Sequence, residues 1–167
     1  MKPKNVLYIS SDEHQRNAVG CYGHPFVKTP TMDALAAKGT RFTNAYTPSP
    51  ICVPGRAALA TGRYVHENRC WDNSSGYHGH MESWGHVLQA AGHRVDSIGK
   101  LHYRSGDDSN GFENEILPMH LNNGVGSVIY SVKNPLPKNI LKDSKIAKNI
   151  GPGESSYARY DGRIADE

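Results

Sequence analysis

The sequence predicts an α/β sandwich with a largely parallel central sheet flanked by helices. Two observations favour this class. Strand-like segments alternate along the chain with helix-like segments, as in sheets whose parallel strands are joined by helices. The first strand-like segment, residues 5–10, contains the continuous apolar run Val-Leu-Tyr-Ile, which is typical of a strand buried on both faces. In such sheets ligands bind beyond the carboxyl ends of the strands.

Two further segments have strand character. Residues 41–46 alternate between polar and apolar side chains, and residues 93–98 form the third strand-like stretch. Asp12 follows the first strand, Cys52 lies in the loop after the second, and Lys100 follows the third. Because the carboxyl ends of parallel strands meet at one edge of a sheet, we expect these side chains to converge there.

Three helices are expected, over residues 32–38, 54–60 and 84–91. Each begins at a residue that favours a helix start and is followed by a glycine that favours a helix end. The starting residues are Thr31, Pro54 and Ser83, and the glycines are Gly39, Gly62 and Gly92.

Length and composition suit one globular domain. The chain has 167 residues, of which 37% are hydrophobic and 21% charged, and its net charge is +3. This small excess neither requires nor excludes a nucleic-acid partner, and we expect none. No stretch approaches the ~20 apolar residues of a membrane span, and the apolar run near the N-terminus is too short for a signal peptide. We therefore expect a cytoplasmic protein without a membrane partner.

Within this domain the character changes after residue 105. Residues 1–105 contain the alternating strands and helices, whereas residues 106–167 are rich in loops, prolines and lysines. We interpret the first range as the N-terminal part of a catalytic domain. The second range is interpreted as an extension of the same domain that is apparently truncated, so the sheet is expected to be incomplete.

One short motif has the spacing of a reactive site. Cys52 lies two residues before Pro54, so it is expected at the N-terminus of a helix, where the helix dipole stabilises negative charge. Arg56 follows one turn later and can reach back toward the same position. Three residues separate the cysteine from the arginine, whereas a cysteine phosphatase would need five. The other cysteines, Cys21 and Cys70, are interpreted as structural free thiols.

This motif, Cys-x-Pro-x-Arg followed by Thr61-Gly62, resembles the signature of the type I sulfatases, which belong to the alkaline phosphatase superfamily. In that family the cysteine is oxidised to formylglycine, whose hydrated aldehyde is the nucleophile. The resemblance covers roughly the first 105 residues and includes further segments in the family's order. These are the strand end at Asp12, Gly20-Cys-Tyr-Gly23, Thr29-Pro30, Asn44-Ala-Tyr46 and Ile98-Gly-Lys100-Leu-His102.

The resemblance implies a role for each candidate residue. Asp12, Glu13 and the modified Cys52 would bind a divalent cation, for which Ca²⁺ is the family's usual choice and Mn²⁺ an alternative. Many sulfatases have two adjacent aspartates where this chain has Asp12-Glu13. Arg56, Lys100 and His102 would act with Cys52 in catalysis, and Asn73 would contact the substrate.

The implied function is hydrolysis of a small sulfate ester, after a formylglycine-generating enzyme has modified Cys52. Two alternatives stay open. The Trp71-Asp72-Asn73 segment resembles the branch that contains choline sulfatases and phosphonate monoester hydrolases, so a phosphonate monoester or phosphodiester is a second substrate class. The family's later metal ligands are not found after residue 105, so an inactive fragment is the third reading. Homo-oligomerisation also stays open.

Overall fold

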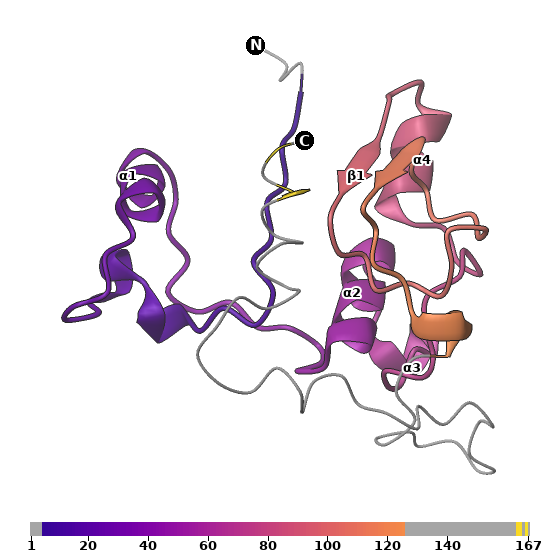
Figure 1. Cartoon of the computed structure of the whole chain (residues 1–167), viewed down its shortest axis with the longest axis horizontal. Coiled ribbons are helices and arrows are strands. Elements are labelled where there is room, and N and C mark those ends of the chain that lie inside the picture. Colours follow the sequence, from indigo (N-terminus) through magenta and orange to yellow (C-terminus); the bar gives the residue numbers. More distant parts are fainter. Residues whose placement is uncertain (1–4, 126–162, 165, 167) are drawn as a thin grey trace. The chain divides into compact units, whose positions relative to one another are not determined.

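The computed structural model describes residues 5–125, 163–164 and 166 (Figure 1). The chain divides into two compact units, Met1–Tyr46 and Thr47–Glu167. Most of the predicted extension, residues 126–162, lies outside the described residues. The proposed boundary at residue 105 therefore stays a prediction.

The first unit contains helix α1 (Pro30–Lys38) and two short 3-10 helices, η1 (Arg16–Ala18) and η2 (Gly20–Tyr22). The helix predicted over 32–38 is confirmed, although it begins at Pro30 and Thr29 precedes it at the N-cap position. The Asp33 carboxylate accepts hydrogen bonds from the Cys21 backbone amide at 2.7 Å and from the Thr29 hydroxyl at 3.0 Å. One acidic side chain in the first turn of α1 thus holds η2 against the helix.

The strands predicted over residues 5–10 and 41–46 are not formed among the described residues. Residues 5–10 are exposed, and the exposed fractions of Val6 and Leu7 are 86% and 83%. A strand is stabilised by hydrogen bonds to a neighbouring strand, and no described segment forms a ladder with either range. The prediction was wrong because it used the apolar pattern alone, which does not supply that neighbour.

The second unit contains helices α2 (Cys52–Thr61), α3 (Val65–Asn68) and α4 (Trp84–Ala90). Helix α2 begins at Cys52, two residues before the predicted start at Pro54. It ends as predicted at Gly62, which adopts the left-handed conformation and donates its amide to the carbonyl of Ala58. Ser83 precedes α4, and its hydroxyl accepts a hydrogen bond from the amide of His86. Both boundaries follow from local capping chemistry.

The sheet of the second unit is parallel, as predicted, and consists of β1 (Asp96–Ile98) and β2 (Asn114–Ile116). Asp96 pairs with Asn114 and Ile98 with Ile116. Of the strand predicted over residues 93–98, only the second half, Asp96–Ile98, is part of the sheet. Strand β2 was not predicted, because three residues with the sequence Asn-Glu-Ile have no recognisable strand pattern and residues 106–167 were interpreted as rich in loops.

The core of the second unit lies between α2 and the segment that follows β1. Ala57 and Ala60 on α2 pack with Cys70, Tyr77 and Tyr103. The two tyrosine rings meet edge to face at 5.0 Å between centroids. Small alanine side chains let the bulky tyrosines approach the helix closely, and this packing sets the position of α2.

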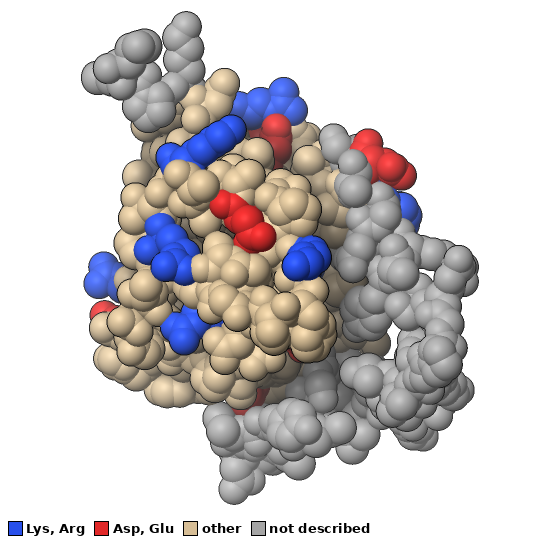
Figure 2. Space-filling view, turned by 90° about the vertical axis from the view of Figure 1, so that its left-hand side faces the viewer, with Lys and Arg blue, Asp and Glu red and all other residues tan. Residues whose placement is uncertain are grey.

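Charged side chains are dispersed over the face of the molecule in Figure 2, where Lys and Arg lie apart from one another with acidic groups among them. The charge on this face is therefore mixed and does not form a basic stripe. Among the described residues, no helix has both the length and the apolar character needed to cross a membrane.

Candidate active site

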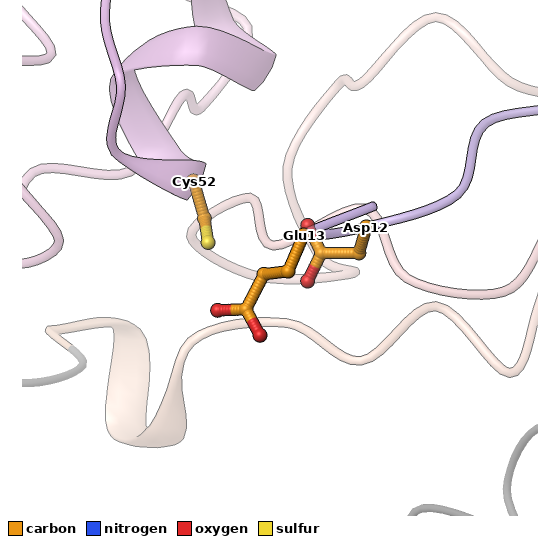
Figure 3. Close-up of side chains that lie close together, drawn as sticks. All are labelled: Asp12, Glu13 and Cys52. Carbon is orange, nitrogen blue, oxygen red and sulfur yellow. The ribbon is translucent and has the colours of Figure 1, made fainter. Parts of the chain in front are cut away.

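Cys52 is the first residue of α2 and is half-buried (Figure 3). Ile51 before it has an extended backbone, and its carbonyl accepts the amide hydrogen of Gly55 at 3.0 Å, which closes the first helical turn. Neither Ile51 nor Pro54 has the chemistry of a capping group, because isoleucine has no polar side-chain atom and proline has no N–H. The Ser49 hydroxyl accepts the amide hydrogen of Ile51 at 3.3 Å, so it is the amides inside the first turn that need partners from elsewhere in the chain.

Asn73 supplies one of these partners. Its Oδ1 accepts a hydrogen bond at 3.1 Å from the amide of Val53, the residue after Cys52. Asn73 is half-buried and belongs to a turn over residues 72–75. The residue that was predicted to contact the substrate thus lies next to the candidate nucleophile.

Arg56 is half-buried on α2, and its guanidinium Nη1 donates a hydrogen bond to the backbone carbonyl of Lys100. The same guanidinium lies near the Tyr103 phenol. Burial raises the pKa of Tyr103 well above its ordinary value, and the positive charge of Arg56 opposes part of this rise. Tyr103 therefore stays a neutral phenol at physiological pH beside a permanent cation.

The backbone from Gly99 to Tyr103 continues alongside the residues after β2. The amides of Gly99, Leu101 and His102 donate to the carbonyls of residues 116, 118 and 119 at 2.8, 2.6 and 3.0 Å. His102 has a φ of 57°, in the left-handed region that non-glycine residues rarely occupy. Such a conformation costs about 1–3 kcal/mol, and here the hydrogen bonds to the neighbouring segment hold it. Lys100 and His102 therefore lie on a fixed backbone.

Asp12 and Glu13 belong to the first unit. They form a turn in which Glu13 has a φ of 57°, and both side chains are exposed (Figure 3). Two consecutive carboxylates offer the oxygen donors that hard divalent cations prefer. Their assignment as metal ligands remains a prediction.

Within the second unit the structure joins the predicted residues through hydrogen bonds. Helix α2 carries Cys52 and Arg56, Arg56 contacts the backbone of Lys100, and Asn73 contacts the first turn of the helix. Sequence reasoning missed Tyr103 and the segment after β2, which support this arrangement. The apolar character of Tyr103, one residue after the predicted His102, was the only local signal for its burial.

Comparison with known proteins assigns the family. A family model described as Sulfatase matches residues 4–151, which is most of the chain. The chain belongs to the sulfatase family. The predicted family is confirmed by this match, and the predicted fold class by the structural relative described below.

Several sulfatases resemble this chain. N-acetylglucosamine-6-O-sulfatase of Bacteroides thetaiotaomicron is 38% identical over 101 residues, which are 60% of this chain and 18% of that protein. Arylsulfatase K of Homo sapiens is 37% identical over 108 residues, 65% of this chain and 20% of that protein. The structure of BT4656 in complex with its substrate D-glucosamine-2-N,6-O-disulfate is 38% identical, with a TM-score of 0.59 over 62% of this chain and 21% of that one. This sulfatase-family chain spans about a fifth of the length of those relatives.

Proposed function

We propose that this chain supplies the nucleophile and part of the anion-binding site of a sulfuric ester hydrolase. The observation that carries the proposal is the arrangement at the start of α2 in a member of the sulfatase family. Cys52 is the first helical residue, and one turn later Arg56 is hydrogen-bonded to the backbone of Lys100. A potential nucleophile and two cationic side chains are thus held by one helix and the segment that it contacts.

We propose that a formylglycine-generating enzyme, using molecular oxygen as the oxidant, oxidises Cβ of Cys52 by two electrons, removes its thiol sulfur and leaves the aldehyde of formylglycine. The hydrated aldehyde supplies two hydroxyl groups on one carbon. One attacks the sulfur of the ester, the S–O bond to the alcohol breaks, and the alcohol leaves with a proton. Loss of a proton from the other hydroxyl then breaks the C–O bond to the sulfate, which releases sulfate and restores the aldehyde. A serine in the same position would leave a sulfate ester that external water must hydrolyse. This difference gives the modification its chemical purpose.

The cationic residues act on the charge of the substrate. A sulfate monoester carries negative oxygens that repel a nucleophile, so its charge must be neutralised before reaction. The guanidinium of Arg56 and the ammonium of Lys100 would supply this positive charge, and the hydrogen bond of Arg56 to the Lys100 carbonyl positions the guanidinium in advance. His102 is the candidate acceptor for the proton lost in the release step.

Asp12 and Glu13 would hold a divalent metal ion together with the modified Cys52. The donor set fits a hard cation, because both acidic residues present carboxylate oxygens and formylglycine would replace a soft sulfur by oxygen. Ca²⁺ is the proposed ion and Mn²⁺ the alternative. When bound, such a cation supplies positive charge that offsets the charge of the ester. A site for Ca²⁺ needs 6–8 oxygen ligands, so further ligands or water must complete it.

We propose a sulfated sugar as the substrate class. The support comes from two comparisons: one found an N-acetylglucosamine-6-O-sulfatase, and the other found the structure of BT4656 with its substrate D-glucosamine-2-N,6-O-disulfate. Each sulfate group of such a sugar carries one negative charge, which Arg56 and Lys100 can bind.

Two measurements test the proposed function. The protein is co-expressed with a formylglycine-generating enzyme and its mass is measured. The intact mass should be about 18 Da lower, and the peptide that contains Cys52 should carry this loss. The modified enzyme should then hydrolyse an aryl sulfate and a glucosamine 6-sulfate faster than an aryl phosphonate monoester. Faster turnover of the phosphonate would contradict the proposed sulfatase activity and favour a phosphonate monoester hydrolase. A modified protein that hydrolyses neither ester with added Ca²⁺ or Mn²⁺ would contradict both and favour the inactive fragment.

A further inference from the structure

The first turn of α2 has no capping group in its own sequence. The amides at the start of a helix have no partner within the helix, and a Ser, Thr, Asp or Asn at the N-cap usually satisfies one of them. Here the N-cap is Ile51, which makes no side-chain hydrogen bond to the helix. Pro54 has no amide hydrogen, and the amide of Gly55 already bonds to the carbonyl of Ile51. This leaves the amides of Cys52 and Val53 as the donors of the first turn.

Asn73 takes the place of the missing cap from twenty residues further along the chain. Its Oδ1 accepts the amide hydrogen of Val53 at 3.1 Å. Because a backbone amide can only donate, this bond also decides which way the Asn73 amide faces: Oδ1 toward α2, and Nδ2 away from the Val53 amide.

A buried aspartate holds the turn that carries Asn73. Asp72 is 1% exposed, and its Oδ1 accepts hydrogen bonds from the amide of Ser74 at 2.8 Å and from its hydroxyl at 2.5 Å. The hydroxyl of Ser75 lies 3.3 Å from the same oxygen. Such bonds between a side chain and the following residues form a rigid Asx turn. Asn73 is thus presented to α2 from a fixed backbone.

We propose that Asn73 is a positioning residue for Cys52. It caps α2 through Val53 and so fixes the backbone that carries the side chain of Cys52. Its effect on catalysis rests on the proposed function of Cys52. One consequence concerns the substrate. Since Asn73 occupies the Val53 amide and Pro54 has none, the first turn offers a bound anion only the amide of Cys52. Neutralisation of the ester then falls to the cationic side chains of Arg56 and Lys100.

Hydrogen exchange at the Val53 amide tests this role without any need for turnover. We compare wild type with Asn73→Ala, which removes the acceptor, and with Asn73→Asp, which keeps an oxygen in its place. Asn114→Ala is the matched control, because Asn114 lies in β2 and bonds to the side chain of Asp96. Exchange at Val53 should be about fivefold faster in Asn73→Ala and close to the wild-type rate in Asn73→Asp and Asn114→Ala. An unchanged rate in Asn73→Ala, or an equal acceleration in Asn114→Ala, would overturn the proposal.

Steady-state kinetics of the modified enzyme separate positioning from substrate binding. A nucleophile on a loosened helix start is misplaced in the reaction, so Asn73→Ala should lower kcat about 10- to 100-fold with KM little changed. A raised KM with unchanged kcat and unchanged Val53 exchange would assign Asn73 to substrate binding and overturn the positioning role. If Val53 exchange accelerates as expected while the modified wild type turns over no ester, the cap is upheld and the proposed function fails. The two ideas are thus tested separately.

Discussion

The guanidinium of Arg56 donates a hydrogen bond to the backbone carbonyl of Lys100, a residue 44 positions later in the chain. This bond joins α2, which begins at Cys52, to the segment that continues from β1. Arginine has five N–H donors in a fixed planar arrangement, so a guanidinium can contact more than one group at a time. One side chain therefore connects two elements of the second unit.

We expect Arg56→Lys to lower kcat/KM about 10²–10³-fold while the fold is retained. Lysine keeps the charge but presents a point donor, so it cannot bond to the Lys100 carbonyl and to the ester in the same geometry. Steady-state kinetics on a sulfate ester would measure the loss. Arg63→Lys is the control, since Arg63 is exposed and pairs with Glu67 at 3.6 Å. Equal activity of both variants would exclude a geometric role for Arg56.

Cys52→Ala should reduce turnover by about 10⁴-fold or more, because the variant cannot form the covalent intermediate. Circular dichroism should show an unchanged fold, since alanine favours a helix and Cys52 is only half-buried. Cys21→Ala provides the comparison, because Cys21 is also half-buried but lies in η2. Activity of Cys52→Ala within tenfold of wild type would contradict the covalent mechanism.

Chelation and replacement of the acidic pair test the metal assignment. Treatment with EDTA should abolish turnover, and added Ca²⁺ or Mn²⁺ should restore it. Asp12→Asn and Glu13→Gln should raise the metal concentration needed for half-maximal activity about tenfold or more, because each removes a charged ligand. Asp107→Asn, at another exposed acidic residue that has an acidic neighbour, should leave that concentration unchanged. Metal-independent turnover after chelation would remove Asp12 and Glu13 from the mechanism.

The buried Tyr103 predicts a loss of stability at alkaline pH. Burial, reinforced by the nearby Tyr77 phenol, raises the pKa of Tyr103 above its ordinary value of 10.0. The folded chain then holds this proton more tightly than the unfolded chain. The contribution of the protonated Tyr103 to the free energy of unfolding is fully present below about pH 10. It is lost as pH rises above that value, by up to about 1.4 kcal/mol per pH unit.

Tyr103→Phe cannot ionise, so its free energy of unfolding should fall less steeply between about pH 9 and pH 11. Urea unfolding at several pH values would measure this slope. Tyr64→Phe, in which the replaced ring is 65% exposed, is the matched change and should keep the wild-type slope. Parallel curves for wild type and Tyr103→Phe would show that Tyr103 does not control the alkaline transition.

Gly85 on α4 lies against the backbone of Gly111, and a β-carbon at position 85 would collide with the carbonyl oxygen of that residue. Gly85→Ala should therefore lower the free energy of unfolding by about 1–3 kcal/mol, despite the better helix propensity of alanine. Gly106→Ala is the control, because a β-carbon there would make only ordinary contacts, the nearest at 3.5 Å to His120. A stabilised Gly85→Ala would show that α4 can move away from Gly111.

The family and the central motif were predictable from the sequence because they depend on neighbours along the chain. Cys52, Pro54 and Arg56 lie within five residues, and the helical repeat alone places the arginine one turn after the cysteine. Capping residues are equally local, so Ser83 and Gly62 marked helix boundaries correctly. Even so, the helix began at Cys52 and not at Pro54, since boundary signals locate a helix start only to within a few residues.

Tertiary structure decided what depends on partners that are distant in the sequence. Strand β2 exists because Asn114 to Ile116 found β1 as a neighbour, whereas the more apolar residues 5–10 form no strand among the described residues. The bonds of Asn73 to Val53 and of Arg56 to Lys100 connect residues 20 and 44 positions apart. No local pattern specifies such pairs, because a backbone amide or carbonyl is the same chemical group at every residue and only folding selects which side chain reaches it.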